Sequence, residues 1–209
     1  MRIVPDPTNK AIRILLLEDS RVDADLIARE LERSEMRVLL ERVDSEASFI
    51  AALDTFAPDV VLSDHALAQF KSHAALETLR AISPATPFIM VTGSQLPSIT
   101  SASIRAGADD VVFKTHLGGL AASISHALDV RRPLGTLSAR QVEVLKLVAE
   151  GYRTRDIANR LGLRVKTVES HRYALMKRLQ MESVVGLVHF AIRVGVIPLD
   201  PGSLERISS

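Results

Sequence analysis

Five polar side chains stand at the carboxyl ends of short apolar segments, where they could act on one ligand. Glu18 and Asp19 follow "ILLL", Asp64 follows "VVLS", Thr92 follows "FIMV" and Lys114 follows "VVF". A single acid at such a position is usually a helix cap or a solvated loop residue. Five suitable residue types at the ends of four segments favour a common site.

This set of side chains is suited to phosphoryl transfer. Three carboxylates held close together repel one another, and a divalent cation relieves that repulsion. Mg²⁺ prefers hard oxygen ligands and keeps waters for a phosphate. A carboxylate can act as the nucleophile that forms an acyl phosphate, and an ammonium and a hydroxyl can stabilise charge on the phosphoryl oxygens.

The five residues converge only if the segments before them are neighbouring strands of one sheet. Strands are expected at 11–17, 37–43, 59–63, 87–92 and 110–114, and helices at 20–34, 45–56, 73–82, 98–108 and 117–130. This alternation predicts an α/β doubly wound fold, with a five-stranded parallel sheet covered by helices on both faces. Ligands of such sheets bind beyond the carboxyl ends of the strands, which is where the five residues are expected.

The segments "LLLEDS", "PDVVLSD", "VTG" and "AGADDVVFK" carry a resemblance to a known family. Residues 11–130 resemble the flavodoxin/CheY-like receiver domain of a two-component response regulator. The resemblance implies that Asp64 accepts a phosphoryl group from a sensor histidine kinase, with only self-phosphotransfer and slow autodephosphorylation as chemistry. It implies an Mg²⁺ site and phosphoryl contacts formed by Glu18, Asp19, Asp64, the backbone carbonyl of Ala66, Thr92 and Lys114.

The chain departs from the receiver pattern at several positions. Leu67 and Ala68 replace the usual Met/Leu-Pro pair, and the Gly usually found a little further on is absent. The switch aromatic usually found three residues before the lysine is Val111, and the Pro that usually follows it is Thr115. The chemical residues are retained, so phosphorylation is still expected, but rotation of an aromatic at position 111 cannot relay the signal.

A second pattern follows in residues 154–180. Val168, Leu175 and Leu179 share one stripe of an expected helix at 165–180, opposite a polar face. A short helix at 154–162, with Thr154 as N-cap and Gly162 as stop, precedes it through a tight turn. The pair predicts a helix-turn-helix whose second helix enters the major groove of DNA, although an ordinary amphipathic helix has the same pattern.

Residues 137–197, beginning "LSARQVEVLKLVAEG", resemble the LuxR/NarL-type helix-turn-helix DNA-binding domain. The resemblance assigns base-facing positions to Glu169, Ser170 and Tyr173, and phosphate-approaching positions to Lys166, Thr167, Arg172 and Lys177. Arg153 and Thr154 would lie near the DNA backbone. It also implies that a last helix at 183–196 pairs two domains, so that a homodimer binds double-stranded DNA.

Two departures in this segment bear on the DNA target. Arg164 replaces the usual Ser or Thr at the start of the recognition helix, which loses an N-cap worth about 1 kcal/mol but adds a cation near DNA. Glu169 replaces what is often a basic residue. Its carboxylate can accept from cytosine N4 yet repels phosphates, so an unusual target sequence is expected.

Composition agrees with two modules. The 209-residue chain has a net charge of +1. Residues 1–132 hold 14 Lys and Arg against 18 Asp and Glu, a net charge of −4, whereas residues 133–209 hold 12 against 7, a net charge of +5. A basic module suits an anionic partner. The sequence has no Cys, no apolar run of membrane-spanning length and no signal-peptide core, so a cytoplasmic protein without a membrane partner is expected.

The expected layout is a receiver domain at 11–130, a linker at 131–136, a DNA-binding domain at 137–197 and a C-terminal tail at 198–209. The resulting hypothesis is a phosphorylation-switched, DNA-binding transcriptional regulator. One alternative is a phosphorylation-independent DNA binder whose atypical receiver is an interaction module. Another is a haloacid-dehalogenase-like phosphatase, which the absence of a second acid at Ala66 disfavours.

Overall fold

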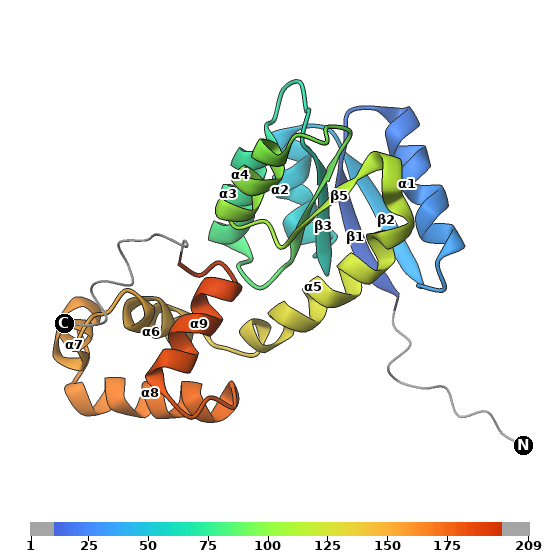
Figure 1. The fold of residues 1–209 in the computed structure, drawn as a ribbon. Coiled ribbons are helices and arrows are strands. Elements are labelled where there is room, and N and C mark those ends of the chain that lie inside the picture. The colour runs from blue at the N-terminus through green and yellow to red at the C-terminus, as the bar shows by residue number, and fades with distance from the viewer. Residues whose placement is uncertain (1–10, 198–209) are drawn as a thin grey trace, which may run out of the picture. The chain divides into compact units, whose positions relative to one another are not determined.

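The computed structural model describes residues 11–197, and within them the chain divides into two compact units between Asp129 and Val130 (Figure 1). The tail expected at 198–209 lies outside the described residues. Each unit is described by itself below. Among the helices of residues 11–197, none has the length and apolar character needed to cross a membrane.

The first unit contains a five-stranded parallel sheet with the strand order β2-β1-β3-β4-β5. Its strands are β1 Ile12–Leu17, β2 Val38–Val43, β3 Val60–Asp64, β4 Phe88–Thr92 and β5 Asp110–Phe113. Its helices are α1 Arg21–Arg33, α2 Glu46–Thr55, α3 Ser72–Ile82, α4 Pro97–Arg105, the 3₁₀ helix η1 Lys114–Gly119 and the first part of α5 Leu120–Gly135, whose residues from Val130 onward belong to the second unit. This confirms the predicted fold class.

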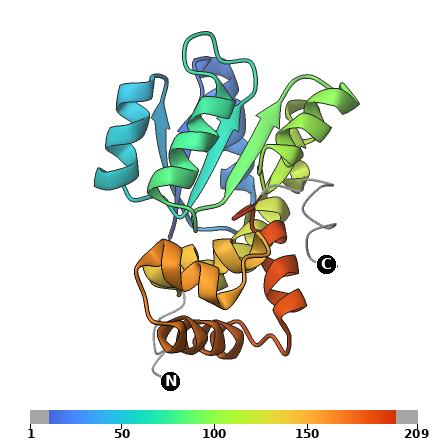
Figure 2. The same cartoon turned by 90° about the vertical axis from the view of Figure 1, so that its left-hand side faces the viewer.

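Helices cover both faces of the sheet, as Figures 1 and 2 show. Ile14, Leu16 and Leu62 pack on one face with side chains of α1 and α5. Leu15 and Val61 pack on the other with side chains of α2 and α3. Successive strand residues therefore enter opposite cores, which explains why the strands are apolar without alternation.

The strand register brings the predicted site residues to one edge. Leu17 of β1 pairs with Ser63 of β3, and Thr92 of β4 pairs with Phe113 of β5. The residues that follow these strands therefore emerge at the same level. The parallel strands thus bring residues that are distant in the sequence to the same edge of the sheet.

The segment 131–136 differs from the expected linker, because α5 continues through Gly135 with Pro133 inside it. A proline removes one backbone donor from a helix and normally disfavours its interior. Arg131 and Leu134 are nevertheless buried, each about 1% exposed. We attribute the extended helix to the burial of these side chains, which the local sequence signals of charge, Pro and Gly did not reveal.

Within its described residues, 130–197, the second unit contains four helices beyond the end of α5: α6 Ala139–Ala149, α7 Thr154–Leu161, α8 Val165–Arg178 and α9 Val184–Arg193. Ser138 and Gln141 form a capping box at the start of α6, and Ser183 caps α9. Gly162 ends α7 in the left-handed region at φ 64°, as predicted. The expected N-cap Thr154 is wrong by one residue, since Arg153 holds that position without a side-chain cap bond.

Candidate functional site

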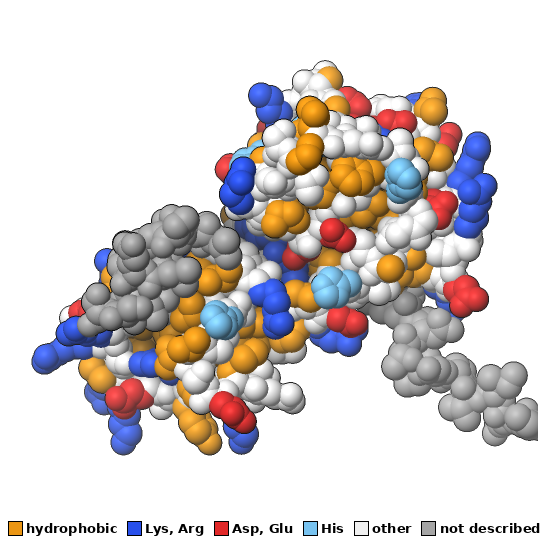
Figure 3. All heavy atoms as spheres, viewed as in Figure 1, with side chains coloured by type: hydrophobic (Ala, Val, Ile, Leu, Met, Phe, Trp, Pro, Cys, Tyr) orange, Lys and Arg blue, Asp and Glu red, His pale blue; other side chains and the backbone are white. Residues whose placement is uncertain are grey.

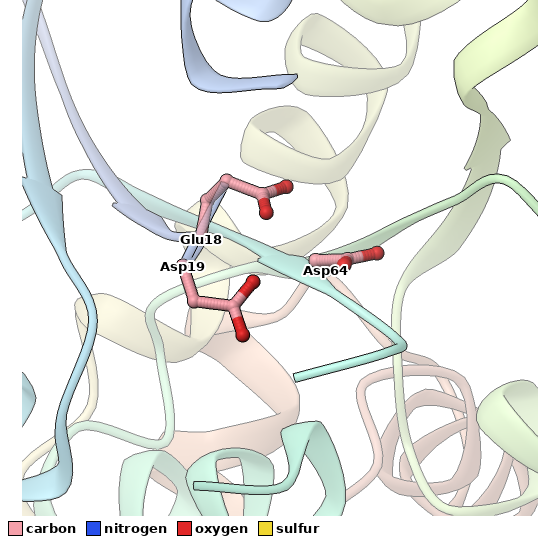
Figure 4. A group of neighbouring side chains, drawn as sticks. All are labelled: Glu18, Asp19 and Asp64. Atoms are coloured by element: carbon pink, nitrogen blue, oxygen red, sulfur yellow. The ribbon is translucent and has the colours of Figure 1, made fainter. Parts of the chain in front are cut away.

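Three carboxylates meet at the carboxyl edge of the sheet (Figure 4). Glu18 and Asp19 follow β1, Asp64 ends β3, and one carboxylate oxygen of each lies within 4.8 Å of the others. Glu18 and Asp64 are buried, whereas Asp19 is exposed. Hard oxygen donors at this spacing, open to solvent on one side, fit a small divalent cation such as Mg²⁺.

Lys114 lies beside these acids and forms three ion pairs. Its Nζ is 2.6 Å from Asp23 Oδ2, 2.8 Å from Glu18 Oε2 and 3.3 Å from Asp64 Oδ1. Burial lowers the pKa of Lys114, but the hydrogen bonds to Asp23 and Glu18, together with the charges of Asp64 and Glu18, raise that pKa above its usual value. The ammonium therefore stays charged beside Asp64.

Glu18 is fully buried, and its two carboxylate oxygens have different partners. Oε2 accepts from Lys114, and Oε1 accepts from the backbone N–H of Ser20 at 3.0 Å. Burial raises the pKa of Glu18, against the lowering effect of these bonds, and the nearby Asp64 charge raises it further. A cation at this position would stabilise the ionised carboxylate.

Asp19 connects β1 to the loop after Asp64. Its Oδ2 accepts from the backbone N–H of Ala68 at 3.1 Å. Asp19 and Ala68 line a pocket of about 290 Å³, together with Asp44, Ser45, Leu67 and Gln69. The polypeptide around the acids is therefore held partly by one of the acids themselves. Ala66 lies two residues after Asp64 in this loop and is exposed. The role of its backbone carbonyl as a metal ligand stays a prediction.

Thr92 ends β4 and is 1% exposed. Its Oγ1 accepts from the backbone N–H of Ser94 at 3.0 Å. Further along the same loop, Gln95 Nε2 donates to Thr115 Oγ1 at 3.1 Å, which joins the loop after β4 to η1. Thr115 thus makes a polar contact that the usual proline could not make, while Val111 packs against the core on the α2 and α3 face.

Three supporting residues were not predicted from the sequence. Ser72 Oγ donates to the backbone carbonyl of Asp64. Arg42 Nη1 donates to the backbone carbonyl of Glu18 at 2.7 Å. Asp23 lies in the first turn of α1, where an acid is usually assigned to the helix dipole, so its contact with Lys114 was missed. No periodic pattern distinguishes these residues, because each acts through a tertiary contact.

The candidate DNA-binding residues of the second unit fall into two groups by exposure. The exposed ones are Arg153, Lys166, Glu169, Ser170, Tyr173 and Lys177. The half-buried ones are Thr154, Thr167 and Arg172. Figure 3 shows Lys and Arg side chains along the outer edge of this unit near α7 and α8, interspersed with a few acids.

Two of the predicted DNA contacts also have partners within the unit. Arg172 Nη1 donates to Thr154 Oγ1 at 2.5 Å, which joins α8 to the start of α7. Ser170 Oγ donates to the backbone carbonyl of Lys166 at 3.0 Å. Arg172 therefore links the two helices through a hydrogen bond as well as lying near the polar face.

Apolar packing orients the polar face of α8. Val168 and Leu175 are fully buried, and Leu179 is 6% exposed, which confirms the predicted apolar stripe. Arg140 Nη2 donates to the carbonyl of Leu161 at 2.7 Å, beside the left-handed Gly162. The turn between α7 and α8 is thus held by α6, and the opposite side of α8 is left to solvent.

A family model described as the response regulator receiver domain matches residues 14–124, more than half of the chain. The chain belongs to this family. A second model, described as bacterial regulatory proteins of the luxR family, matches residues 135–191 of the same response regulator. It therefore combines a receiver with a LuxR-type helix-turn-helix domain, as two-component DNA-binding response regulators do.

Curated relatives agree with this assignment. The response regulator is 29% identical to the transcriptional regulatory protein FixJ of Rhizobium meliloti over 68% of this chain and 79% of FixJ. It is 27% identical to the fimbriae Z protein of Salmonella typhimurium over 77% of this chain and 86% of that protein. The oxygen regulatory protein NreC of Staphylococcus haemolyticus is 37% identical over 40% of each chain.

One solved receiver domain has a fold similar to that of the first unit. A CheY-like receiver domain protein from Methanospirillum hungatei has a TM-score of 0.51 and 24% identity, over 59% of this response regulator and 98% of that chain. RcsB of Salmonella enterica serovar Typhimurium, bound to promoter rprA in the presence of the phosphomimetic BeF₃⁻, has a TM-score of 0.49 and 21% identity. The match covers 86% of this response regulator and 98% of the RcsB chain.

Proposed function

We propose that Asp64 is the phosphoacceptor of this response regulator and that its phosphorylation controls DNA binding by the second unit. The observation that carries the proposal is the position of Asp64, within 4.8 Å of the Glu18 and Asp19 carboxylates and 3.3 Å from Lys114 Nζ. Nothing observed favours the alternative of a receiver that does not use phosphate.

In the proposed reaction, a carboxylate oxygen of Asp64 attacks the phosphorus of a phosphohistidine on a sensor kinase. The P–N bond breaks, an O–P bond forms, and the imidazole leaves with the bond's electron pair. Glu18, Asp19, Asp64 and the Ala66 carbonyl would hold Mg²⁺, which would neutralise charge on the carboxylates and the phosphoryl oxygens. Lys114 and the Thr92 hydroxyl would donate to the phosphoryl oxygens.

Binding of a phosphoryl group to Asp64 would require the contacts of Lys114 and Thr92 to rearrange. Lys114 would exchange part of its ion pairing with Asp64 for a bond to a phosphoryl oxygen. The Thr92 hydroxyl already accepts from Ser94, so its own proton is free to be donated. A movement of Thr92 toward the phosphoryl group would carry the Ser94 amide with it. This movement could begin the conformational change without an aromatic side chain at position 111.

For the second unit, we propose that α8 enters the major groove as a homodimer binds double-stranded DNA. Lys166, Arg153 and Lys177 would supply phosphate contacts and most of the affinity, and Glu169 and Tyr173 would contact base edges. The proposed domains are residues 11–130 for the receiver and 137–197 for DNA binding. We further propose a cytoplasmic protein that does no chemistry beyond self-phosphotransfer and slow autodephosphorylation.

The decisive experiment is the intact mass of the protein after incubation with Mg²⁺ and acetyl phosphate, with Asp64→Asn as the matched control. A gain of one phosphoryl group by the parent, absent from the variant, would support the proposal. If neither gains mass with acetyl phosphate or with a phosphorylated histidine kinase, the acceptor role of Asp64 is wrong. The same samples then select sequences from a random double-stranded DNA pool, which tests whether phosphorylation changes binding.

A further inference from the structure

The strongest contact of Lys114 is with a carboxylate that has no part in the proposed reaction. Asp23 Oδ2 is 2.6 Å from Lys114 Nζ, shorter than the distances to Glu18 and to Asp64. Asp23 comes from α1, where Ser20 Oγ accepts from its backbone N–H at 3.3 Å. The N-cap of the helix therefore fixes the backbone from which this carboxylate reaches Lys114.

An ammonium group has three N–H donors, and three carboxylates face Lys114. A phosphoryl group on Asp64 would need at least one of these donors. Glu18 and Asp64 would share their charge with Mg²⁺, whereas Asp23 is not among the proposed Mg²⁺ ligands and has Lys114 as its ion-pair partner. Asp23 thus competes with the phosphoryl group for Lys114 and repels its charge.

We propose that Asp23 is a positioning residue that holds Lys114 in the unphosphorylated state and weakens the site's affinity for phosphoryl groups. This inference rests on the proposed function, because it concerns the same reaction at Asp64. Its consequence is a shorter-lived phosphorylated state, since Lys114 has an alternative partner 2.6 Å away. The receiver would then return to its resting form more readily than a receiver without this acid.

The variant Asp23→Asn tests the proposal because it removes the charge and keeps the side-chain shape. Asp25→Asn is the matched control, since it makes the same charge change at an exposed position of α1. Asp23→Glu is the conservative rescue, and Asp23→Ser replaces Asp23→Asn if that variant does not fold. Calorimetric titration of each protein with Mg²⁺ comes first, so that all later measurements are made at saturating Mg²⁺.

The main readout is the affinity for beryllofluoride, a phosphoryl mimic. We expect Asp23→Asn to bind it about fivefold more tightly than the parent, the effect of one nearby charge in a partly solvated site. The acetyl phosphate concentration that gives half-maximal phosphorylation should fall, with little change in the maximal rate. The half-life of the phosphorylated form, followed by intact mass, should lengthen. Asp25→Asn and Asp23→Glu should behave like the parent.

Opposite results would overturn the proposal. Unchanged or weaker beryllofluoride binding by Asp23→Asn, while the parent and Asp25→Asn are phosphorylated normally, would show that Asp23 does not compete. A fall in the maximal rate alone would show that Asp23 only supports the fold around Lys114. If the parent itself neither binds beryllofluoride nor gains a phosphoryl group, the proposed function fails, and this inference fails with it.

Discussion

At the scale of single residues, the ammonium of Lys114 contacts three carboxylates that would otherwise repel one another. Glu18 and Asp64 are nearly inaccessible to water, and the desolvation cost of buried charges can exceed what their ion pairs return. The carboxyl edge of the sheet is therefore less stable than a hydrophobic packing would make it. That arrangement suits a site that must accept a cation and an anion.

The exposed acid of this cluster offers a direct test of the cation site. We expect Mg²⁺ to raise the melting temperature of the parent, because a ligand that binds only the folded state stabilises it. Asp19→Asn should lose most of this gain, and the substitution leaves the buried core unchanged because the Asp19 side chain is exposed. Thermal unfolding across a Mg²⁺ titration measures the effect, with the exposed Asp54→Asn as control. An equal gain in Asp19→Asn would exclude Asp19 as a ligand.

Glu169 allows a second test at this scale, on DNA recognition. The exposed carboxylate on α8 should repel phosphates, so Glu169→Gln should bind non-specific duplex DNA more tightly. If Glu169 accepts from a cytosine, the variant should also lose about 1–3 kcal/mol of discrimination at one base pair. Binding to selected and scrambled duplexes over a range of salt concentrations separates the two effects. Unchanged discrimination would remove Glu169 from the base-contacting set.

At the scale of the elements, the turn between α7 and α8 determines how the polar face of α8 is presented. Gly162 stands at φ 64°, and a Cβ added there would meet no atom within 4 Å. The strain of a substitution therefore comes from the backbone alone. Arg172 and Thr154 fix the same pair of helices through a hydrogen bond, so local conformation and a tertiary contact act together.

The glycine at this turn gives the element-scale prediction. Gly162→Ala should destabilise the helical unit by about 1 kcal/mol, whereas Gly162→Asn should cost less because asparagine tolerates the left-handed region. The sequence has two tyrosines, Tyr152 and Tyr173, and no tryptophan. Both tyrosines lie in the second unit, so urea unfolding followed by tyrosine fluorescence reports on the stability of that unit. Equal stability of the two variants would contradict the backbone explanation.

At the scale of the whole molecule, one chain contains a receiver and a LuxR-type helix-turn-helix domain. The proposed switch requires that phosphorylation of the receiver change DNA binding by the helix-turn-helix domain.

Exposed apolar residues on α9 are the proposed pairing surface. Val184 and Val185 are 37% and 54% exposed, whereas Leu187 and Val188 of the same helix are buried. The exposed pair is therefore separate from the core of its own unit.

We expect the phosphorylated protein to bind duplex DNA as a dimer and Val185→Glu to weaken that dimer at least several-fold. A charge introduced into an apolar contact must be desolvated or must break the contact. Sedimentation of the protein with a selected duplex measures the stoichiometry, and phosphorylation by acetyl phosphate serves as the control for an intact receiver. A Val185→Glu dimer of unchanged strength would place the pairing surface elsewhere.

Local sequence patterns were enough to predict the order and type of the elements and the residues that gather at the carboxyl edge of the sheet. Strand ends marked by Glu18, Asp64 and Lys114 predict this edge, because burial on both faces makes each strand a continuous apolar run. The capping box at Ser138 and the glycine at 162 likewise set helix ends through local chemistry. Nine of the ten elements predicted for the first unit lie within three residues of their observed bounds.

The hydrogen-bond and ion-pair partners of the site residues depend on the packing of distant segments and could not be predicted from the sequence. The contact of Asp23 with Lys114 joins positions 91 residues apart, and no local signal distinguishes Asp23 from an ordinary acid at a helix start. The continuation of α5 past Pro133 has the same kind of cause, since burial of Arg131 and Leu134 outweighs the local preference for a break. Helix and strand periodicity follows from neighbours along the chain, whereas ion pairs and burial depend on how distant segments pack.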